Sequence, residues 1–198
     1  MLDILNITYD PKEAIEYFNN VQLHFSEYRW EMDQKFIELH DGNDGDKILG
    51  LYGYSLTTPL ESIHIPYVPH NTNHVTHLGA TQKWYNTNLI FGFSKKIKDT
   101  FAGIEKMSIF CHPPGVHVGA HIDMKTEYTI QFPIVTNSEA NFIILDKSYN
   151  PRPGQVSLFY SGRDFHSTTN YGNTDRVHLN IKCRLDSLEY NKKLSGQL

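Results

Sequence analysis

A histidine and an aspartate stand two residues apart in the stretch GAHIDMKTEY, residues 119 to 128. This stretch alternates in the manner of a β-strand, in which every second side chain projects to the same face of the sheet. His121 and Asp123 would then present an imidazole and a carboxylate on one side. Both groups are ordinary ligands of transition metals, so the pair predicts two ligands of a metal site.

A third ligand is predicted at His166, in the stretch GRDFHSTTNYGNTDRVHLN. This histidine lies near the start of another β-rich run, which can lie beside the first in a barrel. Two imidazoles and one carboxylate on one face of a metal leave its other positions open, an arrangement typical of non-haem Fe(II) oxygenases. The three residues together predict an iron site.

Arg176 follows His166 by ten residues, on the returning strand of a predicted β-hairpin that turns at Gly172 and Asn173. With an odd number of residues in the turn, Arg176 would lie across from Thr168 and face the same side as His166. A buried guanidinium needs an anionic partner, and its planar fork fits a carboxylate. We therefore expect Arg176 to bind either an acidic side chain or a dicarboxylate cosubstrate inside the barrel.

The elements that must position these residues are mainly strands. Seven short β-rich runs follow one another after residue 103 without intervening helices, a pattern typical of a jelly roll. The runs are IEKMSIFC, GVHVGAH, TEYTIQFPIV, ANFIILD, QVSLFY, FHSTTNY and DRVHLNIKC. The predicted fold class is therefore mainly β with flanking helices, a double-stranded β-helix of the cupin-like kind.

Two amphipathic helices are predicted ahead of this core. The first has Asp10 as its N-cap and Pro11 at its first helical position, followed by apolar residues at helical spacing as far as Phe25. The second carries an apolar face from Leu89 to Phe101, with Gly103 at its C-cap. Both helices are expected to pack on the outside of the β core.

We expect a single domain, because 198 residues can bury one sizeable core. Residues 1–103 would form a helical and loop support region, 104–186 the β core with the metal site, and 187–198 a polar, frayed tail. Within the support region, residues 40–47 read as a turn and residues 57–82 as an irregular loop with one short strand. The sequence leaves open whether residues 64–80 of this loop close over the site.

Composition disfavours several other kinds of protein. Lys and Arg number 18 against 22 Asp and Glu, spread along the chain, so nucleic acid is not an expected partner. Cys111 and Cys183 form no CxxC pair, which indicates neither a disulfide framework nor a cysteine zinc site and favours a cytoplasmic location. No secretion signal and no apolar run of about 18 residues is present, so no membrane association is expected. The oligomeric state is left open.

The constellation of His121, Asp123, His166 and Arg176 resembles the Fe(II)/2-oxoglutarate-dependent dioxygenases, over roughly residues 104–184. The resemblance implies that the two histidines and the aspartate bind Fe(II). It also implies that the arginine binds the far carboxylate of 2-oxoglutarate. No catalytic side chain beyond the metal site is then expected, because the metal and the cosubstrate carry the chemistry.

Within that superfamily, the segments PPGVHVGAHID, FPIV and GQVSLFYSGRDFHSTTNYGNTDRVHLNI look most like the aspartyl/asparaginyl β-hydroxylase branch, which includes free-proline cis-hydroxylases. That branch often carries an Arg-Xaa-His pair on the strand after the first iron ligand, which helps to hold 2-oxoglutarate. This chain instead has Thr129 and Gln131 in that neighbourhood. These two residues, and His178 on the Arg176 face, are the further candidates for binding the cosubstrate.

The resemblance also implies the substrate, a small amino acid or an amino-acid side chain in a peptide, with hydroxylation as the reaction. A small anionic substrate would need another cation near the mouth of the barrel. The candidates are Arg163, just before His166, Arg152 in the NPRPG turn, and Lys125 after Asp123, with Arg163 as the first choice.

Two rival functions remain open at this point. The first is a non-catalytic cupin-type barrel that binds a ligand or a metal; such a protein does not need a cation at the position of Arg176. The second is a nucleic-acid dealkylating dioxygenase, which the acidic balance disfavours. That group is expected to have a second arginine six residues after the first, where this chain has Lys182.

Ordinary structural roles are also open for the same residues. His166 could cap a turn, and Arg176 could pair with Asp164 or Asp175. Three further histidines could simply be packed or hydrogen-bonded, as most buried polar side chains are. They are His112, His117 and His178.

Overall fold

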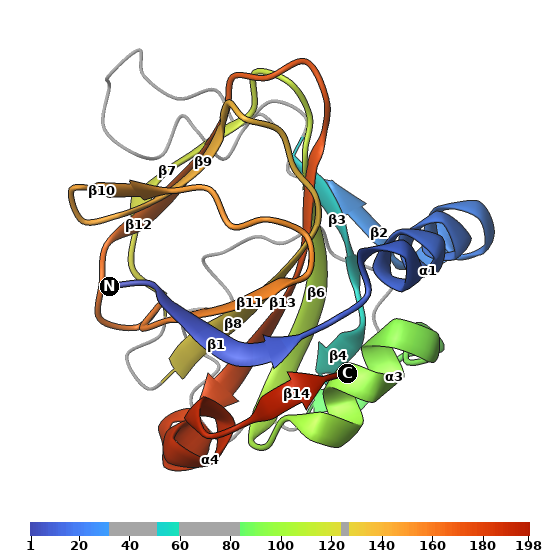
Figure 1. Ribbon diagram of the computed structural model, residues 1–198. Coiled ribbons are helices and arrows are strands. Elements are labelled where there is room, and N and C mark those ends of the chain that lie inside the picture. Colours follow the sequence, from blue (N-terminus) through green and yellow to red (C-terminus); the bar gives the residue numbers. More distant parts are fainter. Residues whose placement is uncertain (32–50, 60–83, 124–126) are drawn as a thin grey trace.

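The computed structural model describes residues 1–31, 51–59, 84–123 and 127–198. Its core consists of an eight-stranded and a four-stranded β-sheet that face each other (Figure 1). This is a double-stranded β-helix of the cupin-like kind, mainly β with few helices, and it confirms the predicted fold class. The predicted turn at 40–47 and most of the predicted loop at 57–82 lie outside the described residues.

All seven strands predicted after residue 103 are present. They are β6 (Ile104–His112), β7 (His117–His121), β8 (Glu127–Val135), β9 (Ala140–Ile144), β11 (Gln155–Phe159), β12 (His166–Asn170) and β13 (Arg176–Arg184). Strands not foreseen are β1 (Asp3–Thr8), β2 (Arg29–Glu31), β3 (Tyr52–Ser55), β5 (Trp84–Asn86), β10 (Lys147–Tyr149) and β14 (Ser195–Gln197). Strand β4 (Thr57–Pro59) is the short strand expected in the 57–82 segment.

The large sheet has the order β14-β1-β11-β8-β13-β6-β3-β2, and the small sheet has the order β10-β9-β12-β7. Strands β4 and β5 form a separate pair. The large sheet therefore draws on strands outside residues 104–186, and the predicted boundary of the β core was too narrow. Strand β13 lies in the middle of the large sheet, between β8 and β6.

Helix α1 (Pro11–His24) begins as predicted, because the Asp10 side chain accepts a hydrogen bond from the Lys12 N–H at 2.9 Å. Helix α3 (Gly92–Thr100) is shorter than predicted and ends before Gly103, which has a φ of 68°. Both helices lie beside the β3 and β6 side of the large sheet (Figure 1). Their apolar faces join the outward-facing residues of the sheet in the main hydrophobic core.

The two faces of β13 have different environments. Its odd-numbered residues from Val177 to Cys183 are apolar and belong to the core under the helices. Because side chains alternate along a strand, its even-numbered residues face the small sheet instead. They are Arg176, His178, Asn180 and Lys182. The interior between the two sheets is thus lined by polar side chains on this strand.

The predicted hairpin of β12 and β13 was wrong. Strand β12 belongs to the small sheet and β13 to the large one, so the chain crosses between sheets after Asn170. Arg176 lies opposite His112 of β6, not opposite Thr168. Arg176 nevertheless points into the interior, because the inner faces of the two sheets are turned toward each other.

The predicted frayed tail was also wrong. The end of the chain forms a 3₁₀ turn η4 (Leu185–Ser187), helix α4 (Leu188–Lys192) and strand β14, which runs parallel to β1. The side chain of Asn191 is fully buried and bonds the backbone N–H and C=O of Ala102 at 2.9 and 3.0 Å. The buried carboxamide of Asn191 thus fixes residues 187–198 to the rest of the fold, although their polar composition predicted a frayed tail.

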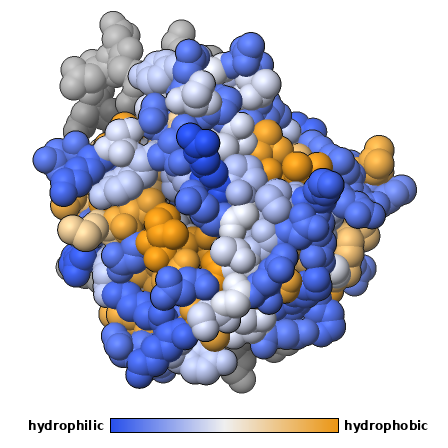
Figure 2. Space-filling view, viewed as in Figure 1, coloured by the Kyte–Doolittle hydropathy of each residue, from blue (hydrophilic) through white to orange (hydrophobic). Residues whose placement is uncertain are grey.

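Polar side chains cover most of the face shown in Figure 2, with smaller apolar areas between them. Among the helices that the structure describes, none is long and apolar enough to cross a membrane.

Candidate metal centre

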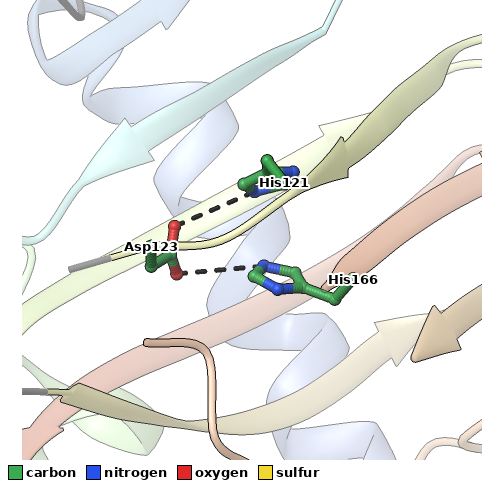
Figure 3. A group of neighbouring side chains, drawn as sticks. All are labelled: His121, Asp123 and His166. Carbon is green, nitrogen blue, oxygen red and sulfur yellow. Dashed lines mark ion pairs between the residues drawn. The ribbon is translucent and has the colours of Figure 1, made fainter. Parts of the chain in front are cut away.

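His121, Asp123 and His166 lie together, with His121 at the end of β7 and His166 at the start of β12 in the small sheet (Figure 3). One ligand atom from each residue can be chosen so that all three lie within 4.8 Å of one another. The two carboxylate oxygens of Asp123 lie 3.8 Å from Nε2 of His121 and 3.9 Å from Nε2 of His166. The side chain of His121 is 44% exposed, whereas that of His166 is 8% exposed. The triad is therefore anchored on one side and open to solvent on the other.

A β-bulge turns His121 into the site. Strand β12 pairs with β7 so that His166 lies opposite His121 and Thr168 lies opposite Val118. One residue of β12 therefore stands opposite two residues of β7, Gly119 and Ala120. This extra residue puts Val118 and His121 on the same face of the sheet, although residues three apart in a regular strand point to opposite faces. The bulge places the imidazoles of His121 and His166 side by side, with ring centres 4.3 Å apart.

Asp123 reaches the site from irregular backbone and not from a strand. Strand β7 ends at His121, so the alternation assumed from the sequence does not extend to Asp123. Its backbone N–H donates to the carbonyl oxygen of Ser161 at 2.8 Å, which fixes the chain just after the strand. The predicted pair is brought together, but by a hydrogen bond to the segment after β11 and not by strand geometry.

Both imidazoles are held by the same local contact. Nδ1 of His121 lies 2.8 Å from the carbonyl oxygen of Gly119, and Nδ1 of His166 lies 3.1 Å from that of Asp164. A carbonyl only accepts, so each Nδ1 carries the proton and each Nε2 keeps its lone pair. Hydrogen bonds of this kind fix the tautomer of metal-binding histidines. The site thus offers two imidazole nitrogens and one carboxylate to an ion.

The charges at the triad also suit a metal. Burial lowers the pKa of His166, and the neighbouring His121 lowers it further, so this imidazole is neutral at pH 7. Burial alone would raise the pKa of Asp123, but the Lys182 ammonium and the two histidines bring it below its usual value. A neutral imidazole and an ionised carboxylate are the forms that bind cations.

Lys182 is a site residue that the sequence analysis did not assign. Its Nζ lies 3.0 Å from Oδ2 of Asp123, and its side chain is 20% exposed. The strand DRVHLNIKC contained the signal, since alternation puts Lys182 on the same face as Arg176. Its approach to Asp123 could not be foreseen, because Asp123 lies on irregular backbone.

Arg176 is almost completely buried at the other end of the same face of β13. Its Nη1 lies 2.9 Å from Nδ1 of His178, which accepts the bond. Among the described residues no carboxylate lies within ion-pair distance of this guanidinium, so the pairing with Asp164 or Asp175 that the sequence left open is not formed. Burial without such a partner lowers the pKa of Arg176 to about 10.

Two histidines pack beside Arg176. The rings of His112 and His178 are stacked with centres 5.2 Å apart, and burial and the nearby Arg176 charge hold the pKa of each well below its usual value. Nε2 of His112 lies 3.4 Å from Oγ1 of Thr168 on the small sheet. The two imidazoles are therefore neutral walls of the pocket around the guanidinium and add no charge.

The other predicted cosubstrate residues lie on β8, next to β13. Thr129 lies opposite Lys182, and Gln131 lies opposite Asn180, so both face the interior. Thr129 donates a hydrogen bond to Oγ of Ser161 at 2.9 Å, which links β8 to the segment that holds Asp123.

The predicted substrate cations are placed less favourably. Arg163 donates two hydrogen bonds to the carboxylate of Asp164, at 2.7 and 3.1 Å, and lies over the ring of Tyr160. Arg152 precedes β11, at the end of that strand opposite to the one that leads to Ser161 and the site. Lys125 lies outside the described residues. Arg163 stands three residues before His166, but its charge is already matched by Asp164.

Asp164 pairs with both Arg163 and the Met1 ammonium, and loss of its carboxylate should destabilise the protein. The hydrogen bonds from Arg163 and the contact with the Met1 ammonium lower the pKa of Asp164 to about 2. Because the pKa of Asp164 is lower in the folded protein than in the unfolded chain, its ionised carboxylate stabilises the fold at pH values above its unfolded-state pKa. This stabilisation is lost as the pH falls through about 2. Asp164→Asn should therefore lower the free energy of unfolding by about 1 to 2 kcal/mol at pH 7.

The difference between Asp164→Asn and the wild type should shrink between about pH 4 and pH 2, as followed by urea denaturation at each pH. Asp186→Asn serves as the control, because Asp186 forms an exposed pair with Arg184 and should change stability little. A constant difference across this pH range would contradict the role given to the Asp164 carboxylate.

With this geometry established, comparison with known proteins identifies the family. Residues 61–185, more than half of the chain, match the aspartyl/asparaginyl β-hydroxylase family. The chain belongs to this family. The suspected branch of the Fe(II)/2-oxoglutarate-dependent dioxygenases is thereby confirmed, and family membership supports an oxygenase role. A search of curated proteins finds no match.

Several solved structures resemble this aspartyl/asparaginyl β-hydroxylase family member. An oxidoreductase of the 2OG-Fe(II) oxygenase family from Burkholderia pseudomallei is 10% identical, with a TM-score of 0.49, and the match covers 92% of this chain and 94% of that one. A predicted oxalate decarboxylase from Thermotoga maritima is 28% identical, with a TM-score of 0.36 and coverage of 48% and 76%. A cupin 2 conserved barrel domain protein from Salinispora arenicola is 18% identical, with a TM-score of 0.34 and coverage of 43% and 67%.

The residues of this family member fit an iron site. Two imidazoles, each with its Nδ1 bonded to a backbone carbonyl, and one carboxylate form a set suited to Fe(II). A buried guanidinium on the facing sheet, with no carboxylate beside it among the residues that the structure describes, fits a cosubstrate that carries a carboxylate at its far end.

Proposed function

We propose that this protein is a non-haem Fe(II)- and 2-oxoglutarate-dependent oxygenase that hydroxylates a small amino acid or an amino-acid side chain in a peptide. His121, Asp123 and His166 would hold the iron, and Arg176 would hold the distal carboxylate of 2-oxoglutarate. The observation that carries the proposal is the burial of Arg176 with no carboxylate partner in the described part of the chain, on the inner face that also reaches Asp123 through Lys182.

The residues supply binding, orientation and protection from water. When bound, iron and 2-oxoglutarate would supply the oxidising chemistry. Dioxygen would convert 2-oxoglutarate to succinate and carbon dioxide and would give its second oxygen atom to the substrate as a hydroxyl group. His121 and His166 keep their Nε2 atoms toward the ion because backbone carbonyls hold their Nδ1 protons. His178 keeps the Arg176 fork in place by accepting from Nη1. A non-catalytic cupin-type barrel would have no need of this cation.

The substrate would enter on the exposed side of His121. Arg163 is matched by Asp164, so binding of an anionic substrate at Arg163 would have to compete with that carboxylate. We retain a small molecule or a peptide as the substrate, with the free amino acid as the first choice, and expect neither nucleic acid nor membrane as a partner.

Two steps test this function. Anaerobic titration with Fe(II) and then 2-oxoglutarate should produce the metal-to-ligand charge-transfer band of the bound pair. Succinate release, with ascorbate present, should then rise above the uncoupled background for a member of a panel of free amino acids and short Pro-, Asp- and Asn-containing peptides. A charge-transfer band without amino-acid turnover, combined with turnover of a sugar, lipid or nucleobase, would overturn the substrate class but not the cofactors.

A further inference from the structure

A row of polar side chains crosses the inner face of the large sheet between Arg176 and the metal triad. Cross-strand pairing places Ser157 opposite Gln131, Gln131 opposite Asn180, and Asn180 opposite Ser108. Residues that are directly opposite in antiparallel strands share a face, with Cβ atoms about 4.5 to 5.5 Å apart. We call Ser157, Gln131 and Asn180 the polar row.

Each side chain of the polar row has one oxygen that accepts no hydrogen bond from the described residues. Oε1 of Gln131, Oδ1 of Asn180 and Oγ of Ser157 are buried without any partner among the described residues. The two carboxamides do not bond each other, although they are neighbours. Ser157 is fully buried and Gln131 is 2% exposed. Buried polar groups are nearly always paired, so three unpaired ones on one face indicate that a ligand or ordered water contacts them.

Solvent reaches the middle of this face. Strand β13 is central in its sheet and its other face is packed in the core, yet Asn180 and Lys182 are both only half-buried. Their accessible surface must therefore lie between the two sheets. A small molecule held by Arg176 and by the metal triad would pass over Asn180, which lies two residues from His178 and two from Lys182.

The surrounding charge decides which atoms of the carboxamides would be used. Arg176 lies on one side of the polar row, and the triad, which fits a divalent cation, lies on the other. The ligand expected between two positive centres is an anion, which only accepts hydrogen bonds. The carboxamides would then present their N–H₂ groups, since the oxygen and nitrogen of Asn and Gln can exchange places by rotation of the amide.

We infer that Asn180 and Gln131, with Ser157 beside them, donate hydrogen bonds to the carboxylate of 2-oxoglutarate that lies next to the metal. The inference rests on the proposed function. Arg176 would hold one end of the dicarboxylate by charge, and the polar row would orient the other end without adding charge. The site would thereby select ligands with an acceptor group at the metal end.

Isosteric replacement tests whether these carboxamides donate hydrogen bonds to the carboxylate of 2-oxoglutarate. Asn180→Asp and Gln131→Glu keep the shape but replace a donor by a negative charge, so each should weaken 2-oxoglutarate binding to the Fe(II) protein by about 100-fold or more. Asn180→Ala removes the donor without adding charge and should weaken binding by about 10-fold. Anaerobic calorimetry measures the affinity, and the charge-transfer band reports binding at the metal.

Asn141→Asp is the matched control, because it makes the same change on β9 of the small sheet. The neighbouring Phe142 packs with Phe159 in the interior, so the Asn141 side chain points away from the interior. Thermal melts and Fe(II) stoichiometry establish that each variant is folded and loaded. Wild-type affinity in Asn180→Asp and Asn180→Ala would overturn the inference while leaving the proposed function intact. Failure of the wild type itself to bind 2-oxoglutarate would overturn both.

Discussion

Replacing His166 by alanine should lower the affinity for Fe(II) by more than about 100-fold, since loss of an outer-shell partner alone costs about 10- to 100-fold. His121→Ala and Asp123→Ala should have the same effect, because each removes one of three ligands. The affinity is measured by competition with a chelator under anaerobic conditions, and the stoichiometry by metal analysis after dialysis.

The three variants should differ in stability. The His121 side chain is 44% exposed, so its replacement should leave the melting temperature almost unchanged. The ring of His166 packs against Phe142 and Phe159, with centres 6.0 and 4.9 Å away, so His166→Ala should lower it. His117→Ala, on the same strand as His121 and packed on Tyr171, is the control and should keep its iron. Stoichiometric iron in all three triad variants would refute the assignment of the ligands.

Replacing Arg176 by methionine should have opposite effects on binding and on stability. The guanidinium is buried, and none of the described carboxylates pairs with it, so the folded protein bears the cost of desolvating it. Arg176→Met removes that cost and should leave the free energy of unfolding unchanged or raised. It also removes the charged partner of 2-oxoglutarate, which should weaken binding by about 2 to 5 kcal/mol, or about 30- to 5,000-fold.

Arg176→Lys should bind with intermediate affinity, because a point charge replaces a fork. Calorimetry gives the affinities and urea denaturation the stabilities, with Arg184→Met, at the exposed end of the same strand, as the control for both. Fe(II) binding should stay near the wild-type value in every case. Unchanged affinity for 2-oxoglutarate in Arg176→Met would exclude the arginine from the cosubstrate site.

The β core could be predicted from the sequence because its signals are local. Each of the seven strands after residue 103 is a short β-rich run bounded by turn residues, and helix α1 is marked by Asp10 and Pro11. Strands β1 and β14 are different, because they gain their structure by pairing with each other and with β11. The tail looked free because its anchor, Asn191, is a polar residue whose partners lie far away in the sequence.

The site was predictable in its residue types and not in its geometry. Spacing singled out the triad and Arg176, and Arg176 does point inward, although the hairpin pairing from which that direction was argued is not formed. The assignment of β12 and β13 to different sheets depends on tertiary packing, so the expected pairing of Arg176 with Thr168 failed. Arg163 looked free, but its partner is the adjacent residue Asp164, a contact that depends on side-chain rotamers.

The bulge at Gly119 and Ala120 makes the pairing of β7, more than its residue types, the quantity that defines this metal centre. If the same residues paired regularly with β12, Ala120 would lie opposite His166 and the His121 ring would turn to the outside of the barrel. Removal of Gly119 or Ala120 would instead give regular pairing with His121 still opposite His166. A relative without the bulge must therefore be aligned with a gap between Val118 and His121, because an ungapped alignment would put the first ligand at Ala120.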